Sequence, residues 1–254
     1  MKIPKEWRGR FGGLAVLAGR WFLNLLFPKE CAGCGSSLPF DNRDYLCDPC
    51  ARGIFWISPP VCERCGCPLF GSVRPPVVCH RCRADPPDFD RARSVFAFRD
   101  AAQAFVLKYK YAGCPYLALP ASRWLQEAGE SVFSREDYDV LIPVPLHPRK
   151  ARERGFNQSE LLAAGLSRFC GIPLAKRKLA RFRYTKTQTR LDVAERRKNM
   201  RGAFRVATPG YFRGKSVLLI DDVHTTGATV NECAMVLKAD GAERVDVLTL
   251  ARAV

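Results

Sequence analysis

A pair of acids and a short threonine-rich loop follow an apolar run near the carboxyl end of the chain. The run 217–220 is typical of a buried parallel strand, and Asp221 and Asp222 come directly after it. The loop leads into a helix, whose N-terminal N–H groups bind phosphate monoesters well, while carboxylates accept hydrogen bonds from vicinal ribose hydroxyls. The sequence therefore predicts a sugar 5-phosphate site formed by Asp221, Asp222, Thr225, Thr226, Gly227, Ala228 and Thr229.

Two residues of this segment have distinct expected roles. Gly227 lets the backbone approach the phosphate closely because it has no Cβ. His224 lies between the acids and the threonines, and we interpret it as a loop residue and not as a catalytic group.

Cysteines provide a second possible chemistry, that of metal binding. Nine of the twelve fall between positions 31 and 82, and eight of these form two tandem sets of Cys-x2-Cys pairs, with twelve residues between the pairs of the first set and thirteen between those of the second. Two such pairs complete a tetrahedral thiolate site with no open position, which is typical of structural Zn²⁺. The predicted ligands are Cys31, Cys34, Cys47, Cys50, Cys62, Cys65, Cys79 and Cys82.

Disulfides or free thiols are the alternative interpretation of these cysteines. Within the zinc interpretation, we favour pairing in chain order over interleaved pairing. Cys67 and His80 are spare candidates that could replace a neighbouring ligand.

Charge is distributed unevenly along the 254-residue chain, whose formal net charge is +16. The stretch 149–215 holds nineteen basic and four acidic residues, so nearly all of the excess lies there. Such a field favours a polyanion or a phosphorylated small molecule, although a solvated basic face would also explain it. The hydrophobic content of 47% excludes global disorder.

The chain divides into three predicted parts. Residues 1–28 form a basic and apolar helical leader, which is too short and too interrupted for a transmembrane span. We expect it to rest on the neighbouring domain or on a membrane surface. Residues 29–88 form a small zinc-ribbon module that needs metal to fold, and residues 89–254 form an α/β domain.

Alternating strand and helix patterns predict that this α/β domain is a parallel sheet flanked by helices. Strands are expected at 94–98, 139–144, 217–220 and 245–250. Helices are expected at 101–111, in a segment that ends at 129, at 158–169 and at 229–239. The strongly basic residues 174–200 receive no assignment.

The segment 217–230, VLLIDDVHTTGATV, resembles the phosphoribosyl pyrophosphate (PRPP) signature of type I phosphoribosyltransferases. The chain also has the tandem ribbons and three short motifs: RGFNQ at 154–158, LKY at 107–109 and LAR at 250–252. Together these features resemble the ComF family of competence-associated proteins, which joins an N-terminal zinc ribbon to a type I phosphoribosyltransferase-like domain. The resemblance covers about residues 22–253.

The resemblance implies roles for further residues. The two acids would hold the ribose hydroxyls, the loop 225–229 would hold the 5-phosphate, and Mg²⁺ would bridge the pyrophosphate and the ribose. The basic segment after residue 144 would take the place of the pyrophosphate loop, and residues 184–200 that of a loop that closes over PRPP. The implied anion contacts are Arg149, Arg152, Arg154, Gln188, Arg196 and Asn199.

The resemblance implies two functions, and the sequence leaves both open. One is transfer of a phosphoribosyl group from PRPP to a nitrogen nucleophile. The other is binding of single-stranded DNA in the cytoplasm during natural transformation, next to DNA-uptake machinery at the inner face of the membrane. Aromatic side chains in the basic stretch could stack on bases. We expect Phe156 and Phe204 to be core residues, which leaves Phe182 and Tyr184. A purely structural zinc protein would leave the two acids unexplained.

Overall fold

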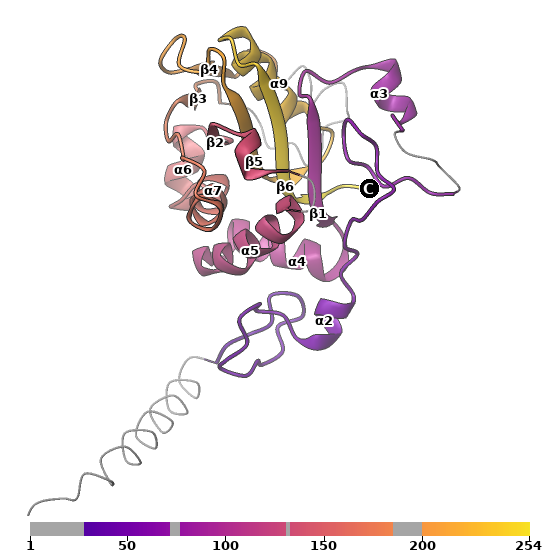
Figure 1. Ribbon diagram of the computed structural model, residues 1–254. Helices are drawn as coiled ribbons and strands as arrows, with labels where there is room; N and C mark the ends of the chain where they lie inside the picture. Colours follow the sequence, from indigo (N-terminus) through magenta and orange to yellow (C-terminus); the bar gives the residue numbers. More distant parts are fainter. Residues whose placement is uncertain (1–27, 72–76, 131–132, 185–199) are drawn as a thin grey trace, which may run out of the picture.

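A four-stranded parallel sheet forms the centre of the protein (Figure 1). The computed structural model describes residues 28–71, 77–130, 133–184 and 200–254. The strand order is β1-β6-β5-β2, with β1 at Arg91–Ala97, β6 at Arg244–Arg252, β5 at Ser216–His224 and β2 at Val140–Pro143. A separate antiparallel pair consists of β3 (Leu179–Arg181) and β4 (Phe204–Val206). The predicted fold class, a parallel sheet flanked by helices, is confirmed.

Both faces of the sheet are buried, because successive residues of β5 point to opposite sides. Leu218 and Ile220 join a core with α4 (Asp100–Tyr111), α5 (Ala118–Glu130) and α7 (Gln158–Cys170). Val217 and Leu219 join a second core with α9 (Ala228–Ala239) and the β3–β4 pair. This two-sided burial explains why the run 217–220 is apolar throughout and does not alternate. Short helical turns complete the domain: η1 (Pro115–Leu117), η2 (Arg135–Asp137) and α6 (Pro148–Arg154).

The two cysteine-rich segments repeat one local structure. Each begins with a knuckle closed by an isolated antiparallel bridge, Glu30–Ser37 in the first and Val61–Pro68 in the second. Each ends in a short helix, α2 (Asp48–Arg52) or α3 (His80–Ala84). We call the segments 29–54 and 60–84 the first and second ribbon.

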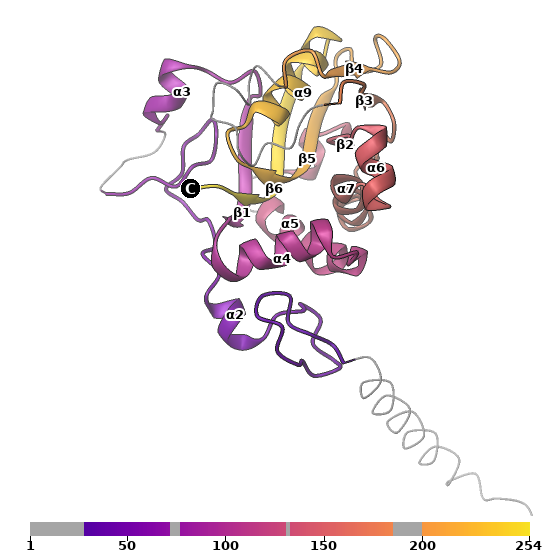
Figure 2. The same ribbon diagram turned by 180° about the vertical axis from the view of Figure 1, so that it is seen from behind.

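The ribbons pack on different cores. The first ribbon adds its buried residues to the core of α4 and α5, next to which it lies in Figure 2, and the second adds cysteines to the core of α9. Because both cores are shared with the α/β part, the boundary at 88/89 stays a prediction. The leader 1–27 lies outside the described residues. Within the described ranges, no helix has the length and apolar character needed to cross a membrane.

Strand β5 continues beyond its predicted end. Its last residues pair with β6, Asp221 opposite Thr249 and His224 opposite Arg252. His224 is 3% exposed, and its ring lies edge-on to that of Phe89 at 5.9 Å. The prediction that His224 is a loop residue is therefore wrong, because pairing with β6 carries the strand past the two acids.

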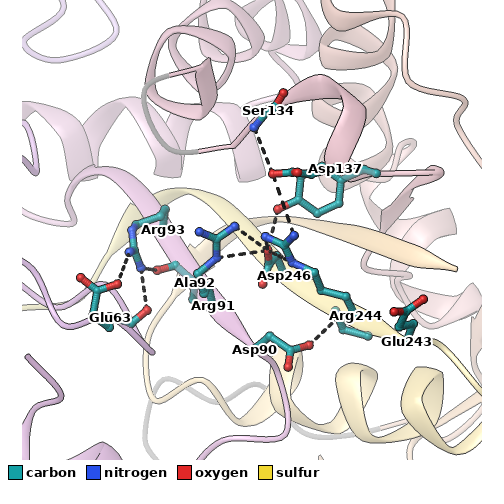
Figure 3. A network of polar contacts seen from close by, with 12 residues as sticks. Glu63, Asp90, Arg91, Ala92, Arg93, Ser134, Asp137, Glu243, Arg244 and Asp246 are labelled. Carbon is teal, nitrogen blue, oxygen red and sulfur yellow. Dashed lines mark hydrogen bonds and ion pairs between the residues drawn. The ribbon is translucent and has the colours of Figure 1, made fainter. Parts of the chain in front are cut away.

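Asp246 connects the amino ends of the strands (Figure 3). Its side chain is fully buried, and one carboxylate oxygen accepts hydrogen bonds from Arg91 of β1 at 3.2 Å and from Arg244 of β6 at 2.8 Å. The same oxygen accepts from the Tyr138 hydroxyl, just before β2, at 2.6 Å. One carboxylate thus fixes three chain segments at the edge opposite the predicted ligand site.

Candidate functional site

Two buried carboxylates lie at the carboxyl end of β5. The Ser159 hydroxyl, in the first turn of α7, donates to Asp221 Oδ1 at 2.9 Å. Lys110 Nζ, at the end of α4, lies 2.8 Å from Asp222 Oδ1. The other oxygen of Asp222 is buried and has no hydrogen-bond partner among the described residues. The acids are thus held by two helices and keep capacity to accept further hydrogen bonds.

Burial raises the pKa of Asp221 to about 7, and the negative charge of Asp222 acts in the same direction. The positive charge of Lys110 and the hydrogen bond from Ser159 oppose this shift. Asp221 therefore keeps its proton to a higher pH than an ordinary aspartate does.

This raised pKa predicts that affinity for ribose 5-phosphate rises with pH. Ribose hydroxyls donate best to the ionised carboxylate, so below pH 7 binding must first expel the Asp221 proton. Between pH 6 and 8 we expect the wild-type affinity to rise roughly tenfold more than that of Asp221→Asn, measured by calorimetric titration. The variant serves as the control for titration of the ligand's own phosphate. Equal pH slopes in both proteins would contradict this assignment.

A tight turn joins β5 to α9. Gly227 is the N-cap of α9 and has a φ of 80°, a left-handed conformation that favours glycine. A Cβ at this position would lie 2.7 Å from Nε2 of the buried His224. The Thr226 hydroxyl accepts a hydrogen bond from Ala228 N–H at 3.3 Å. The turn thus places the amino end of a twelve-residue helix beside the acids, where the helix dipole favours an anion.

A cavity of about 400 Å³ opens at the carboxyl ends of β2 and β5, a size within the range of small-ligand pockets. Both acids line it, together with Thr225 and Thr229. Lys150 of α6 and Arg181 of β3 bring positive charge to the same space. The remaining predicted loop residues, Thr226, Gly227 and Ala228, line a second cavity of about 490 Å³ on the side of the second ribbon.

Three of the four arginines predicted as anion contacts lie in α6. Arg149 pairs with Glu153 at 3.1 Å, and Arg154 donates to the side chain of Gln158. The described lining of the 400 Å³ cavity includes Lys150 and not Arg149, Arg152 or Arg154. The other predicted contacts, Gln188, Arg196 and Asn199, lie outside the described residues.

The first ribbon gathers its four predicted ligands. The Sγ atoms of Cys31, Cys34, Cys47 and Cys50 lie within 4.8 Å of one another. Cys34 and Cys47 are 3.7 Å apart at sulfur, far longer than the roughly 2.05 Å of a disulfide. The N–H groups of Gly33 and Cys47 each donate to Cys31 Sγ at 3.3 Å, which stabilises a thiolate. These residues fit a structural Zn²⁺ ion.

The second ribbon offers one thiol more than a tetrahedral site needs. The Sγ atoms of Cys62, Cys65, Cys67 and Cys79 lie within 4.8 Å of one another. Cys82 is buried, and its thiol interacts with those of Cys65 and Cys79. A hydrogen bond from Cys67 lowers the pKa of Cys65 to about 4, and Arg252 acts in the same direction. This set also fits Zn²⁺, with Cys67 and Cys82 as candidates for the fourth ligand, whereas His80 is exposed.

Comparison with known proteins defines the class of this chain. Residues 22–84 match the model of the double zinc ribbon domain, and residues 159–253 match that of the phosphoribosyl transferase domain. The chain therefore combines a double zinc ribbon with a phosphoribosyltransferase-like domain.

Full-length relatives define the family. The chain is 32% identical over 233 residues to DNA utilization protein YhgH of Salmonella typhimurium, a match that covers 90% of this chain and 99% of that protein. It is 30% identical over 231 residues to Competence protein F of Haemophilus influenzae, covering 89% and 98%. The chain belongs to the ComF family of competence-associated proteins.

Solved structures overlap with this chain only in part. Glutamine PRPP amidotransferase from B. subtilis gives a TM-score of 0.40 at 21% identity, over 57% of this chain and 30% of that one. Purine phosphoribosyltransferase from Pyrococcus horikoshii gives a TM-score of 0.34 at 22% identity, over 53% and 73%.

Proposed function

We propose that the protein binds PRPP or a related ribose 5-phosphate ligand at the carboxyl end of β5, and that it acts in the cytoplasm in DNA uptake. The observation that carries the proposal is the buried pair Asp221 and Asp222 beside the amino end of α9, facing a cavity with three basic side chains. The names of the relatives, a competence protein and DNA utilization proteins, support the link to DNA. A partner in the uptake machinery at the inner face of the membrane is part of this proposal.

Each part of the site has a task in binding. Asp221 and Asp222 accept hydrogen bonds from the two ribose hydroxyls, and the unpartnered Asp222 oxygen suits this task. The loop 225–229 receives the 5-phosphate at the start of α9. Lys150 and Arg181 offer positive charge to the pyrophosphate. The α6 arginines add to the positive field that attracts an anion.

For such a site to catalyse a reaction, the charge on the departing pyrophosphate must be stabilised. Mg²⁺ prefers oxygen ligands and, held next to Asp221 and Asp222, would neutralise charge on the pyrophosphate. In the transfer reaction, a nitrogen nucleophile forms a bond to the anomeric carbon of the ribose while the bond from that carbon to pyrophosphate breaks. Lys150 and Arg181 then stabilise the departing pyrophosphate. Because both carboxylates of the described lining are assigned to the ribose hydroxyls, no further side chain there is an evident general base.

Calorimetric titration of PRPP with Mg²⁺ tests the proposal. We expect the Asp221→Asn/Asp222→Asn double variant to bind about a hundredfold more weakly than the wild type, because two charge-assisted hydrogen bonds are weakened. Asp41→Asn, an exposed carboxylate of the first ribbon, is the matched control and should bind as the wild type does. Equal affinity in the double variant, or no binding in the wild type, would refute the proposal.

Binding of single-stranded DNA is the second candidate, supported by two exposed aromatic rings in the basic stretch. Tyr184 is 45% exposed and lies 5.1 Å from the Arg149 guanidinium and 5.8 Å from Lys150 Nζ. Phe182 is also half-exposed and lies 5.2 Å from the Arg205 guanidinium. Phe204 is buried, and Phe156 packs on the core beside Tyr109. Rings flanked by cations suit stacked bases and phosphates.

A salt series tests this second candidate. We expect affinity for an oligothymidine to fall about tenfold or more between 50 and 200 mM salt, because bound phosphates release counterions. The Tyr184→Ala/Phe182→Ala variant should bind more weakly at every salt concentration and keep the same slope. No binding even at the lowest salt concentration would exclude the DNA role.

A further inference from the structure

We propose that Arg81 and Arg252 are positioning residues that couple the second ribbon to the phosphate-binding loop. Affinity for a ribose 5-phosphate then depends on the metal of the second ribbon. The inference rests on the proposed function, in that it takes the loop 225–229 as the phosphate site.

Arg81 connects the second ribbon directly to the loop. It lies in α3, between Cys79, the N-cap of that helix, and Cys82. Its guanidinium donates a hydrogen bond to the backbone carbonyl of Thr226, in the middle of the loop. Because α3 has only five residues, its position depends on the cysteines at both sides of Arg81.

Arg252 makes the second connection, from the end of β6. Its guanidinium donates to the carbonyl of Cys65 at 2.6 Å and to the sulfur of the same residue at 3.4 Å. Arg252 is 4% exposed, and a buried cation needs an anionic partner, which a zinc-bound thiolate supplies. In the sheet, Arg252 lies opposite His224, the ring that occupies the space beside Gly227. The ribbon thiolate, the strand end and the loop are thus in consecutive contact.

Further contacts prevent the second ribbon from shifting independently. Arg93 of β1 donates to the carbonyl of Glu63 at 3.0 Å and pairs with its carboxylate (Figure 3). Gly66 packs so closely on β1 that a Cβ there would lie 2.3 Å from the Ala92 carbonyl oxygen. Asp88, just after the ribbon, exchanges two hydrogen bonds with Asn231 of α9, at 2.7 and 2.6 Å.

The first ribbon offers an internal comparison. Its ion pairs go to the helices on the other face of the sheet, from Glu30 to Lys108 of α4 and from Asp44 to Arg123 of α5. Its aromatic contact joins Tyr45 to Tyr116 of η1. The two metal sites therefore have different expected effects on the loop, although their local structures are alike.

The test is titration of ribose 5-phosphate into the full-length, zinc-loaded protein. We expect Arg81→Ala to weaken binding about tenfold, the effect of losing a hydrogen bond from a charged donor. Arg81→Lys should recover part of the affinity, because it keeps a charged donor. Arg83→Ala removes the same charge from an exposed position of the same helix and should stay within about twofold of the wild type. All three variants should retain two zinc ions per chain.

Substitution of a predicted zinc ligand in each ribbon extends the test. Binding should be at least tenfold weaker in Cys79→Ser and change less in Cys47→Ser, each with its zinc content measured. Unchanged affinity in Arg81→Ala, or an equal loss in Arg83→Ala, would overturn the coupling while leaving the proposed phosphate site intact. Absence of binding in the wild type would refute the proposed function, and this inference with it.

Discussion

Each of the variants Cys47→Ser and Cys79→Ser should lose one zinc ion per chain and unfold the ribbon that carries the change. In peptide models a structural zinc ion supplies about 10–16 kcal/mol of folding free energy at neutral pH. The ribbons have little else to replace it, since their regular structure consists of isolated bridges and five-residue helices. Metal analysis of the purified variants, with limited proteolysis of the ribbon segments, measures the effect.

Cys170→Ser is the matched control, because this cysteine lies in α7, away from both clusters. It should keep both ions. Retention of two ions by Cys47→Ser and Cys79→Ser would contradict the ligand assignment. The same assay applied to Cys67→Ser and Cys82→Ser identifies the fourth ligand of the second ribbon, since only loss of the true ligand lowers the zinc content.

Asp246→Ala should have a large effect on stability outside the ribbons. The substitution leaves Arg91, Arg244 and the Tyr138 hydroxyl without their shared acceptor at a buried position (Figure 3). Removing one partner of a buried pair typically costs 3–5 kcal/mol, and both arginines are about one-third exposed. We therefore expect a loss of about 3 kcal/mol in the free energy of unfolding, measured by urea denaturation.

Glu243→Ala tests whether the loss of stability in Asp246→Ala comes from the position of the carboxylate or only from its charge. Glu243 lies next to β6 and is exposed, so its removal should change stability by no more than about 0.5 kcal/mol. A similar loss in both variants would show that Asp246 acts through net charge. Asp246→Asn should lie between the two, because it keeps the shape and one acceptor but loses the charge.

Much of the candidate site could be predicted because its residues are contiguous in sequence. The two acids, the threonine loop and the start of α9 follow one another within 221–229, and the apolar run before them identifies a buried strand. Cysteine spacing identified both ribbons in the same way, since knuckle geometry is set by local separation. Composition alone identified the basic stretch 149–215. It did not predict the β3–β4 pair within that stretch, because each strand has only three residues.

The remaining parts of the site depend on contacts between distant segments. Nothing in the sequence links Lys110 to Asp222, Ser159 to Asp221 or Arg81 to Thr226, and only the packing of α4, α7 and the second ribbon brings them together. Lys150 stands within the predicted basic run, but only the orientation of α6 decides that it lines the cavity. The end of β5 was placed too early because its pairing with β6 leaves no mark in the sequence.

A crystal structure of the protein soaked with ribose 5-phosphate tests the central claim most directly. The phosphate should lie at the loop 225–229, with the ribose hydroxyls within hydrogen-bond distance of Asp221 and Asp222. Ribose hydroxyls beyond hydrogen-bond distance of both acids, or a loop without ligand at a concentration that saturates binding in solution, would contradict it.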